Sequence, residues 1–92
     1  MKLSKSIWHS TLNFIKIAFP SAKEVRKVIG KDLGLSFTTK ETNYTIIGEG
    51  LSFLEDGLKT FLQIKLTEVT IKKEEKRFHI IITLDYYEKG AK

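Results

Sequence analysis

The strongest constraint on the fold is a run of alternating side chains near the C-terminus. One side of this run carries the apolar residues Phe78, Ile80, Ile82, Leu84 and Tyr86. The other side carries His79, Ile81, Thr83, Asp85 and Tyr87. A period of two, rich in β-branched and aromatic residues, is typical of a strand with one buried face. We therefore expect a strand here whose first side faces a core.

A partner strand precedes this run. Val69 and Ile71 alternate with polar residues, and a four-residue loop at 74–77 would join the two strands. This loop length places Ile71 opposite Ile80 and Val69 opposite Ile82. A shift by one residue would replace these apolar pairs with mixed ones, so the pattern predicts a hairpin in this register.

Two segments resemble capped helices. SAKE at 21–24 and SFLE at 52–55 both have the form of a capping box, in which Ser and Glu satisfy free backbone N–H groups. We expect helices from Ser21 to Leu33 and from Ser52 to Gln63. The second helix would bury an apolar stripe formed by Leu51, Leu54, Leu58, Phe61 and Leu62.

The first of these helices also runs into a hairpin. Leu35 to Thr39 and Tyr44 to Ile47 alternate like strands, joined by the loop KETN. The chain would then use a helix–strand–strand unit twice. Chance agreement of two capping boxes explains this repeat as well as duplication does.

The segment before Pro20 allows two interpretations. Asn13 to Phe19 is rich in residues that favour strands, and we expect a strand there. Residues 1–12 would be a frayed or separate segment. The alternative makes 5–19 a helix, which leaves four strands and three helices.

The predicted fold is therefore α+β. It is an antiparallel sheet of about five strands with two helices on one face, in the order strand, helix, hairpin, helix, hairpin. The 92 residues would form a single small domain. The chain has no Cys and no apolar run near the ~20 residues that a spanning helix needs. We expect a cytoplasmic protein that does not contact membranes.

No catalytic residue, metal site or cofactor is predicted. The two histidines, His9 and His79, are far apart in the sequence and belong to no ligand cluster. Glu74 and Glu75 are adjacent and would point apart, and no Ser or Thr lies in a nucleophile motif. We expect a protein that is not an enzyme.

The charge of the chain is unevenly distributed. The net charge is +5, and residues 1–31 contain seven basic residues and one acidic residue, which gives +6. Lys23, Arg26, Lys27 and Lys31 would share the polar face of the first helix. This face predicts contacts with the phosphates of RNA or DNA, or else is only a solvated helix face.

The second side of the last strand is the other candidate surface. Ile81 and Tyr87 point away from the predicted core, and Phe14 and Ile47 could join them on an uncovered sheet face. Such a face predicts self-association or a protein partner. Alternatively, the N-terminal segment with Trp8 covers it. The leading hypothesis is a non-enzymatic interaction module, with nucleic-acid binding as the alternative.

The stretch TLNFIKIAFPSAKEVRKVIG, at 11–30, adds a resemblance. Over residues 11–63 the chain resembles the small dimerising, cancer/testis-antigen-like subunit of the KEOPS tRNA-modification complex. The resemblance implies a strand ending at the Phe-Pro step, then a helix, a hairpin and a second helix. The chain departs from the family at Glu55 to Gly57, where the family has basic residues and Asn. The hairpin after Gln63 has no counterpart.

Overall fold

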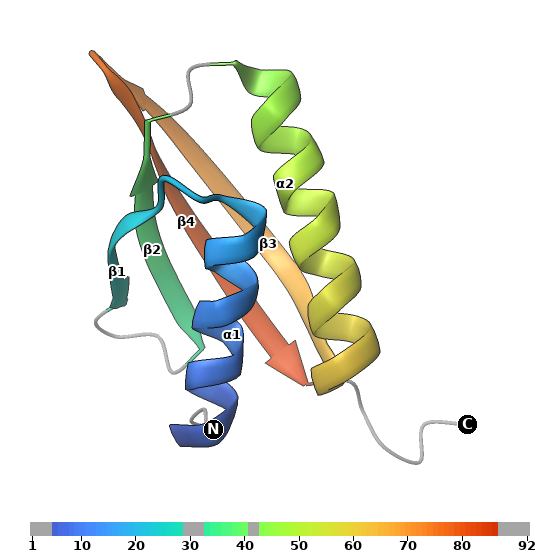
Figure 1. Ribbon diagram of the computed structural model, residues 1–92. Coiled ribbons are helices and arrows are strands. Elements are labelled where there is room, and N and C mark those ends of the chain that lie inside the picture. The colour runs from blue at the N-terminus through green and yellow to red at the C-terminus, as the bar shows by residue number, and fades with distance from the viewer. Residues whose placement is uncertain (1–4, 29–32, 41–42, 87–92) are drawn as a thin grey trace.

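The computed structural model describes residues 5–28, 33–40 and 43–86. These residues form a four-stranded antiparallel sheet with two antiparallel helices on one face (Figure 1). The elements are α1 (Lys5–Ala18), β1 (Lys23–Lys27), β2 (Gly34–Thr39), α2 (Tyr44–Gly57), the π-helical turn η1 (Leu58–Leu62), β3 (Ile64–Glu74) and β4 (Arg77–Tyr86). The strand order is β1-β2-β4-β3. The predicted α+β class and the two helices on one face are confirmed, but the described residues form four strands, one fewer than expected.

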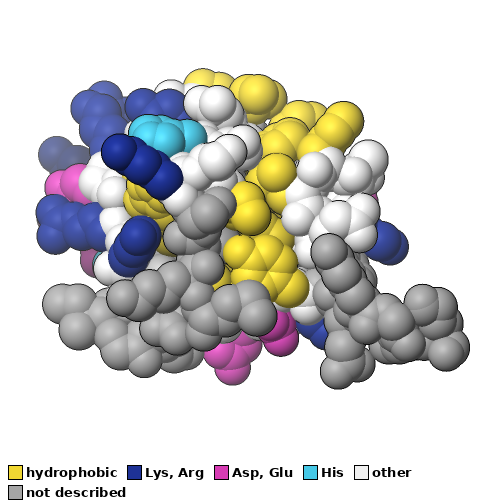
Figure 2. Space-filling model, turned by 90° about the horizontal axis from the view of Figure 1, so that it is seen from below, with side chains coloured by type: hydrophobic (Ala, Val, Ile, Leu, Met, Phe, Trp, Pro, Cys, Tyr) yellow, Lys and Arg dark blue, Asp and Glu magenta, His cyan; other side chains and the backbone are white. Residues whose placement is uncertain are grey.

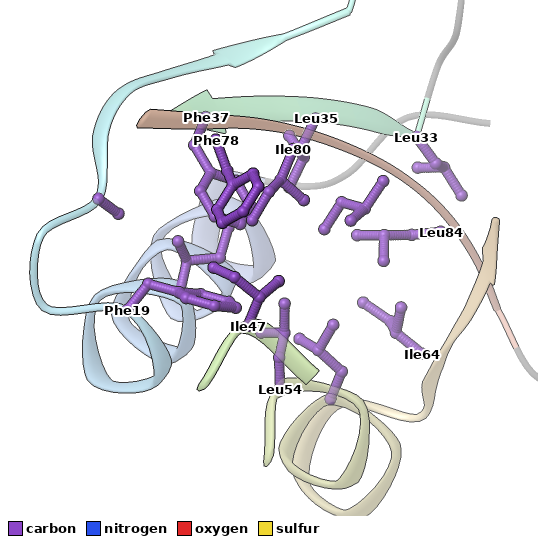
Figure 3. Close-up of a cluster of buried hydrophobic side chains, with 14 residues drawn as sticks. Phe19, Leu33, Leu35, Phe37, Ile47, Leu54, Ile64, Phe78, Ile80 and Leu84 are labelled. Atoms are coloured by element: carbon purple, nitrogen blue, oxygen red, sulfur yellow. The ribbon is translucent and has the colours of Figure 1, made fainter. Parts of the chain in front are cut away.

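The core lies between the sheet and the two helices (Figure 3). Its buried apolar side chains among the described residues are Ile15, Phe19, Ala22, Leu33, Leu35, Phe37, Ile47, Leu54, Leu58, Ile64, Phe78, Ile80, Ile82 and Leu84. On β4 the buried residues alternate with more exposed ones, as the sequence predicted. This side of the sheet is therefore the one that the helices cover.

The β3–β4 hairpin has the predicted register. Ile71 pairs with Ile80 and Val69 pairs with Ile82. Glu74 and Arg77 already pair, so the turn itself contains only Glu75 and Lys76. The observed loop is therefore two residues shorter than the four-residue loop that was expected. Apolar matching across the strands was enough to fix the register, whatever the turn type.

The segment before Pro20 is a helix, so the predicted strand at 13–19 was wrong. The alternative, a helix over 5–19, was right for this segment but wrong in expecting three helices. Thr11 and Ile15 are buried one turn apart, and the Thr11 hydroxyl donates to the Ile7 carbonyl oxygen at 2.8 Å. After the helix, Ala22 N–H donates to the Phe19 carbonyl oxygen, which closes a turn around Pro20.

The helix expected at 21–33 was also wrong, because this segment contains strand β1. Glu24 has a left-handed φ of 54°, and the pairing with β2 shifts between Lys23 and Arg26. This irregularity is a β-bulge, which adds one residue to the strand. It lets Ala22 and Val25, three residues apart, both pack towards the core. A bulged strand thus shows a spacing that looks helical in the sequence.

The strand expected at Tyr44 to Ile47 is the first turn of α2. Asn43 is the N-cap, because its side-chain oxygen accepts a hydrogen bond from Thr45 N–H at 2.8 Å. Ser52, the expected cap, therefore lies in the middle of the helix. Ser21, the other expected cap, accepts a hydrogen bond from the Lys40 N–H.

The chain does use a helix–strand–strand unit twice, with different boundaries from those predicted. The first unit is α1, β1 and β2, and the second is α2, β3 and β4. In each unit the second strand is central and pairs with its counterpart, while the first strand lies at an edge. The arrangement has the symmetry of a two-fold repeat, with the two helices side by side and antiparallel (Figure 1).

Candidate interaction surfaces

The four residues predicted to share an uncovered sheet face do not lie together. Ile47 is fully buried in the core, and Phe14 lies on α1 beside α2, so the predicted placement was wrong for both. Tyr87 lies outside the described residues. Ile81 is on the uncovered face and half-buried, between Ser36 and Thr70 on the neighbouring strands.

The uncovered sheet face is polar and nearly neutral. The strand registers and an ion pair place these basic residues on it: Lys23, Arg26, Lys65, Lys72 and Arg77. Its acidic residues are Glu24, Glu68, Glu74 and Asp85. His79 also lies on this face, as predicted, and pairs with Lys72. Ile81 is thus a lone apolar residue among charges and hydroxyls of the described strands.

One arginine on this face is held by two carboxylates. Arg77 Nε donates to Glu74 Oε1 at 2.7 Å, and Arg77 Nη1 lies 3.6 Å from Glu24 Oε1. The hydrogen bond from Arg77 lowers the pKa of the Glu74 carboxyl below its ordinary value of 4.5, and it raises the pKa of Arg77. Both groups stay charged around neutral pH, so Arg77 contributes little net positive charge.

The residues predicted to form a basic helix face lie on strand β1 instead. Lys23, Arg26 and Lys27 are all exposed there, and Lys31 lies outside the described residues. Lys27 Nζ lies 5.2 Å from the centre of the Trp8 ring on α1, at a distance that favours a cation–π contact. The structure therefore keeps three of the four cations together, but at a sheet edge.

Four exposed apolar side chains of the helices form a surface that was not predicted from the sequence. Ile17 on α1 is 63% exposed, Ile46 and Phe53 on α2 are 45% and 47% exposed, and Phe61 in η1 is 72% exposed. We call these four residues the helical face. Ile46 and Phe53 are seven residues apart and so lie on one side of α2. Seen from the end of the molecule where α1 begins, hydrophobic side chains form a band that runs from the helices towards the sheet (Figure 2).

The helices α1 and α2 pack closely at two glycines of α2. A Cβ at Gly57 would lie 2.8 Å from the Phe14 ring, and one at Gly50 would lie 2.5 Å from the Phe19 ring. The two helices therefore approach each other at positions without side chains. The Phe14 and Phe61 rings stack with centroids 5.8 Å apart and bridge the seam between α1 and η1.

The π-helical turn accounts for the position of Phe61. The sequence placed Phe61 in the buried stripe of a regular helix, but a π-helical turn holds more residues per turn and rotates the following side chains. Leu58 stays buried, whereas Phe61 points out to the seam. Ile46 and Phe53 could be seen to share one side of a helix only if the helix was known to begin at Tyr44.

The two helices carry opposite charges. The described residues of α1 include Lys5 and Lys16 and no acidic residue. In α2 and η1, Lys59 is the only basic residue against the acidic residues Glu49, Glu55 and Asp56. Glu49 and Asp56 are four residues before and three residues after Phe53, so they flank it on the helix surface.

Both edges of the sheet are unsuited to pairing with another strand. The β1 edge has five residues, of which four are charged, and it carries the bulge at Glu24. The β3 edge has a register shift between Leu66 and Glu68 and carries three lysines. Bulges and edge lysines are the usual protection of a sheet against strand addition.

Other classes of site have no support in the described part of the chain. Residues 5–28, 33–40 and 43–86 hold no group of three His, Cys, Asp or Glu side chains arranged to bind a metal ion. None of the helices there combines the length and apolar character that crossing a bilayer requires. Comparisons with protein-family models, with curated proteins and with solved structures found no match to this chain.

Proposed function

We propose that this protein is a non-enzymatic interaction module that assembles with a second copy of itself through the helical face. The observation that carries the proposal is the exposure of Phe53, Phe61 and Ile17 on one surface. Single exposed apolar residues are ordinary, but adjacent large ones on one face are typical of a protein contact. Removing them from water on assembly would favour the complex.

The other surfaces of the described chain fit self-association less well. The uncovered sheet face is polar, and Arg77 there already has carboxylate partners. The two sheet edges are bulged and charged, which disfavours strand addition. The helical face is the remaining surface where large apolar side chains gather. Ile81, the interface residue predicted on the sheet, stands alone in its polar surroundings.

The charges of the two helices favour a second copy as the partner. A two-fold axis parallel to the helices would lay α1 of one protomer over α2 of the other. Lys16 would then approach the acidic residues that flank Phe53, Glu49 and Asp56. A two-fold axis across the helices would instead set α1 on α1 and α2 on α2, with like charges facing each other. Complementary charge thus selects one of the two symmetric arrangements.

Sedimentation velocity over a wide concentration range tests this proposal. The wild-type chain is expected to show a concentration-dependent dimer. The Phe53→Ser/Phe61→Ser double variant should raise the dissociation constant at least tenfold, because a tenfold change needs only about 1.4 kcal/mol and each Phe buried on assembly contributes about 1.5–3 kcal/mol. Both side chains are exposed in the monomer, so circular dichroism should show an unchanged fold.

Two matched variants complete the experiment. Tyr44→Ser removes an aromatic residue that is 57% exposed on the opposite side of α2, and it should leave the dimer intact. Ile81→Lys changes the uncovered sheet face and should also leave it intact. A chain that stays monomeric at the highest concentration would refute the proposal. If Ile81→Lys dissociated the dimer and the double Phe variant did not, the contact would lie on the uncovered sheet face instead of the helical face.

A further inference from the structure

A second surface, at the β1 edge, is distinct from the helical face. It consists of Lys23, Arg26 and Lys27 on β1 and Lys5 at the start of α1, all of them exposed. We call these four residues the basic edge. Figure 2 shows Lys and Arg side chains gathered on the side of the molecule where β1 lies. None of the four belongs to the proposed self-association contact.

The basic edge projects cations on both sides of one strand. Lys23 pairs with Thr38 and Arg26 pairs with Ser36, so both point to the uncovered sheet face. Lys27 pairs with Leu35 and therefore points to the helix side, where it lies over Trp8. Lys5 lies about one helical turn before Trp8 on α1. The charges thus surround the edge and do not form a row on one face.

Little negative charge lies within the N-terminal stretch that supplies these cations. Between Lys5 and Val28 the basic residues are Lys5, Lys16, Lys23, Arg26 and Lys27. The single acidic residue in that stretch is Glu24, and its carboxylate lies 3.6 Å from Arg77 Nη1. Five basic residues and one acidic residue give this stretch a net charge of +4. Glu24 also forms an ion pair with Arg77, which lies outside the stretch, so its negative charge is already compensated. Such a surface attracts a polyanion.

We propose that the basic edge binds the phosphate backbone of nucleic acid. Several exposed cations along an edge strand suit an extended row of phosphates better than a single small anion, which needs an enclosed site. A membrane surface fits less well, because the large exposed apolar residues lie on the helical face and not on this edge. Because the edge offers mainly phosphate contacts, binding should be nearly independent of sequence.

Fluorescence anisotropy with a labelled DNA duplex of mixed sequence tests the proposal. Four phosphate contacts give a slope of about −3.6 for log affinity against log salt concentration. Between 50 and 200 mM salt the affinity should therefore fall roughly a hundredfold. The Lys23→Gln/Arg26→Gln variant should reduce the slope to about −1.8. Both side chains are exposed, so the fold and the oligomeric state should not change.

The matched control removes the same charge from the opposite edge of the sheet. Lys72 and Lys73 lie on β3. The Lys72→Gln/Lys73→Gln variant should leave the slope of log affinity against log salt concentration close to the wild-type value. Absence of binding at low salt would overturn the proposal, as would equal effects of the two double variants. So would binding to vesicles that contain phosphatidylserine with no binding to the duplex. A chain that is monomeric but still binds the duplex would refute the proposed self-association and leave the nucleic-acid proposal standing.

Discussion

The Phe37→Ala variant is expected to lose about 3–5 kcal/mol of unfolding free energy, the usual cost of deleting a buried phenyl ring. Phe37 lies on the central strand β2 and is fully buried, opposite Ile80 of β4. Its ring centroid is 5.3 Å from that of Phe19 at the end of α1. The substitution would leave a cavity where the sheet meets the first helix. Urea denaturation followed by circular dichroism measures the loss.

Phe53→Ala is the control for this prediction. It removes the same ring from an exposed position of α2. The stability of the monomer should change by well under 1 kcal/mol, because little packing is lost at the surface. If Phe37→Ala were as mild as Phe53→Ala, Phe37 could not be part of a packed core, and the placement of α1 on the sheet would be wrong.

The second large effect is expected from adding one methyl group to α2. Gly50→Ala would place a Cβ about 2.5 Å from the Phe19 ring and 3.1 Å from the Ala18 carbonyl oxygen. The Phe19 ring cannot withdraw, because it is buried and packs against Phe37. Overpacking of this kind typically costs about 1–3 kcal/mol. The contact between α1 and α2 should loosen.

Gly48→Ala is the matched control, two residues earlier in the same helix. A Cβ there would meet no atom within 4 Å. Both variants gain the same helix propensity, up to about 1 kcal/mol. Gly48→Ala should therefore stabilise the protein, and Gly50→Ala should be about 1–3 kcal/mol less stable than Gly48→Ala. Equal melting temperatures of the two variants would show that α1 and α2 do not pack closely at Gly50.

The C-terminal hairpin could be predicted because its signal is regular. In β4 every second residue is buried, from Phe78 to Leu84, and no bulge interrupts the strand. Apolar pairs such as Ile71 with Ile80 then leave one acceptable register. The turn residues were not needed for this conclusion.

The first half was predicted less well because a bulge changed the spacing of its apolar residues. Ala22 and Val25 are three residues apart and pack on the same side, which a straight strand would not allow. The interpretation of 21–33 as a helix rested on the SAKE capping box and on this helix-like spacing. The prediction that Lys23, Arg26, Lys27 and Lys31 share the polar face of a helix followed from it. The positive φ of Glu24 that causes the bulge has no clear signal in a Glu residue.

The helical face could not be predicted because it depends on two features of α2. The helix begins at Tyr44, after the N-cap Asn43, although its first turn, YTII, is rich in strand formers and three glycines weaken it. The π-helical turn then moves Phe61 from the buried stripe to the surface. Asn43 followed by Ile47, Leu51, Leu54 and Leu58 was the helical signal present in the sequence.

Cross-linking between single-cysteine variants tests self-association through the helical face most directly. The chain has no Cys, so each introduced thiol is unique. Ile17→Cys lies on α1, and Ser52→Cys lies exposed on the outer side of α2. If α1 of one protomer lies over α2 of the other, a mixture of these two variants should form a mixed disulfide as its main product. A mixture of Ile17→Cys with Lys72→Cys, which lies on the sheet, should not. A predominant Ile17→Cys homodisulfide, or equal yields in both mixtures, would contradict this arrangement.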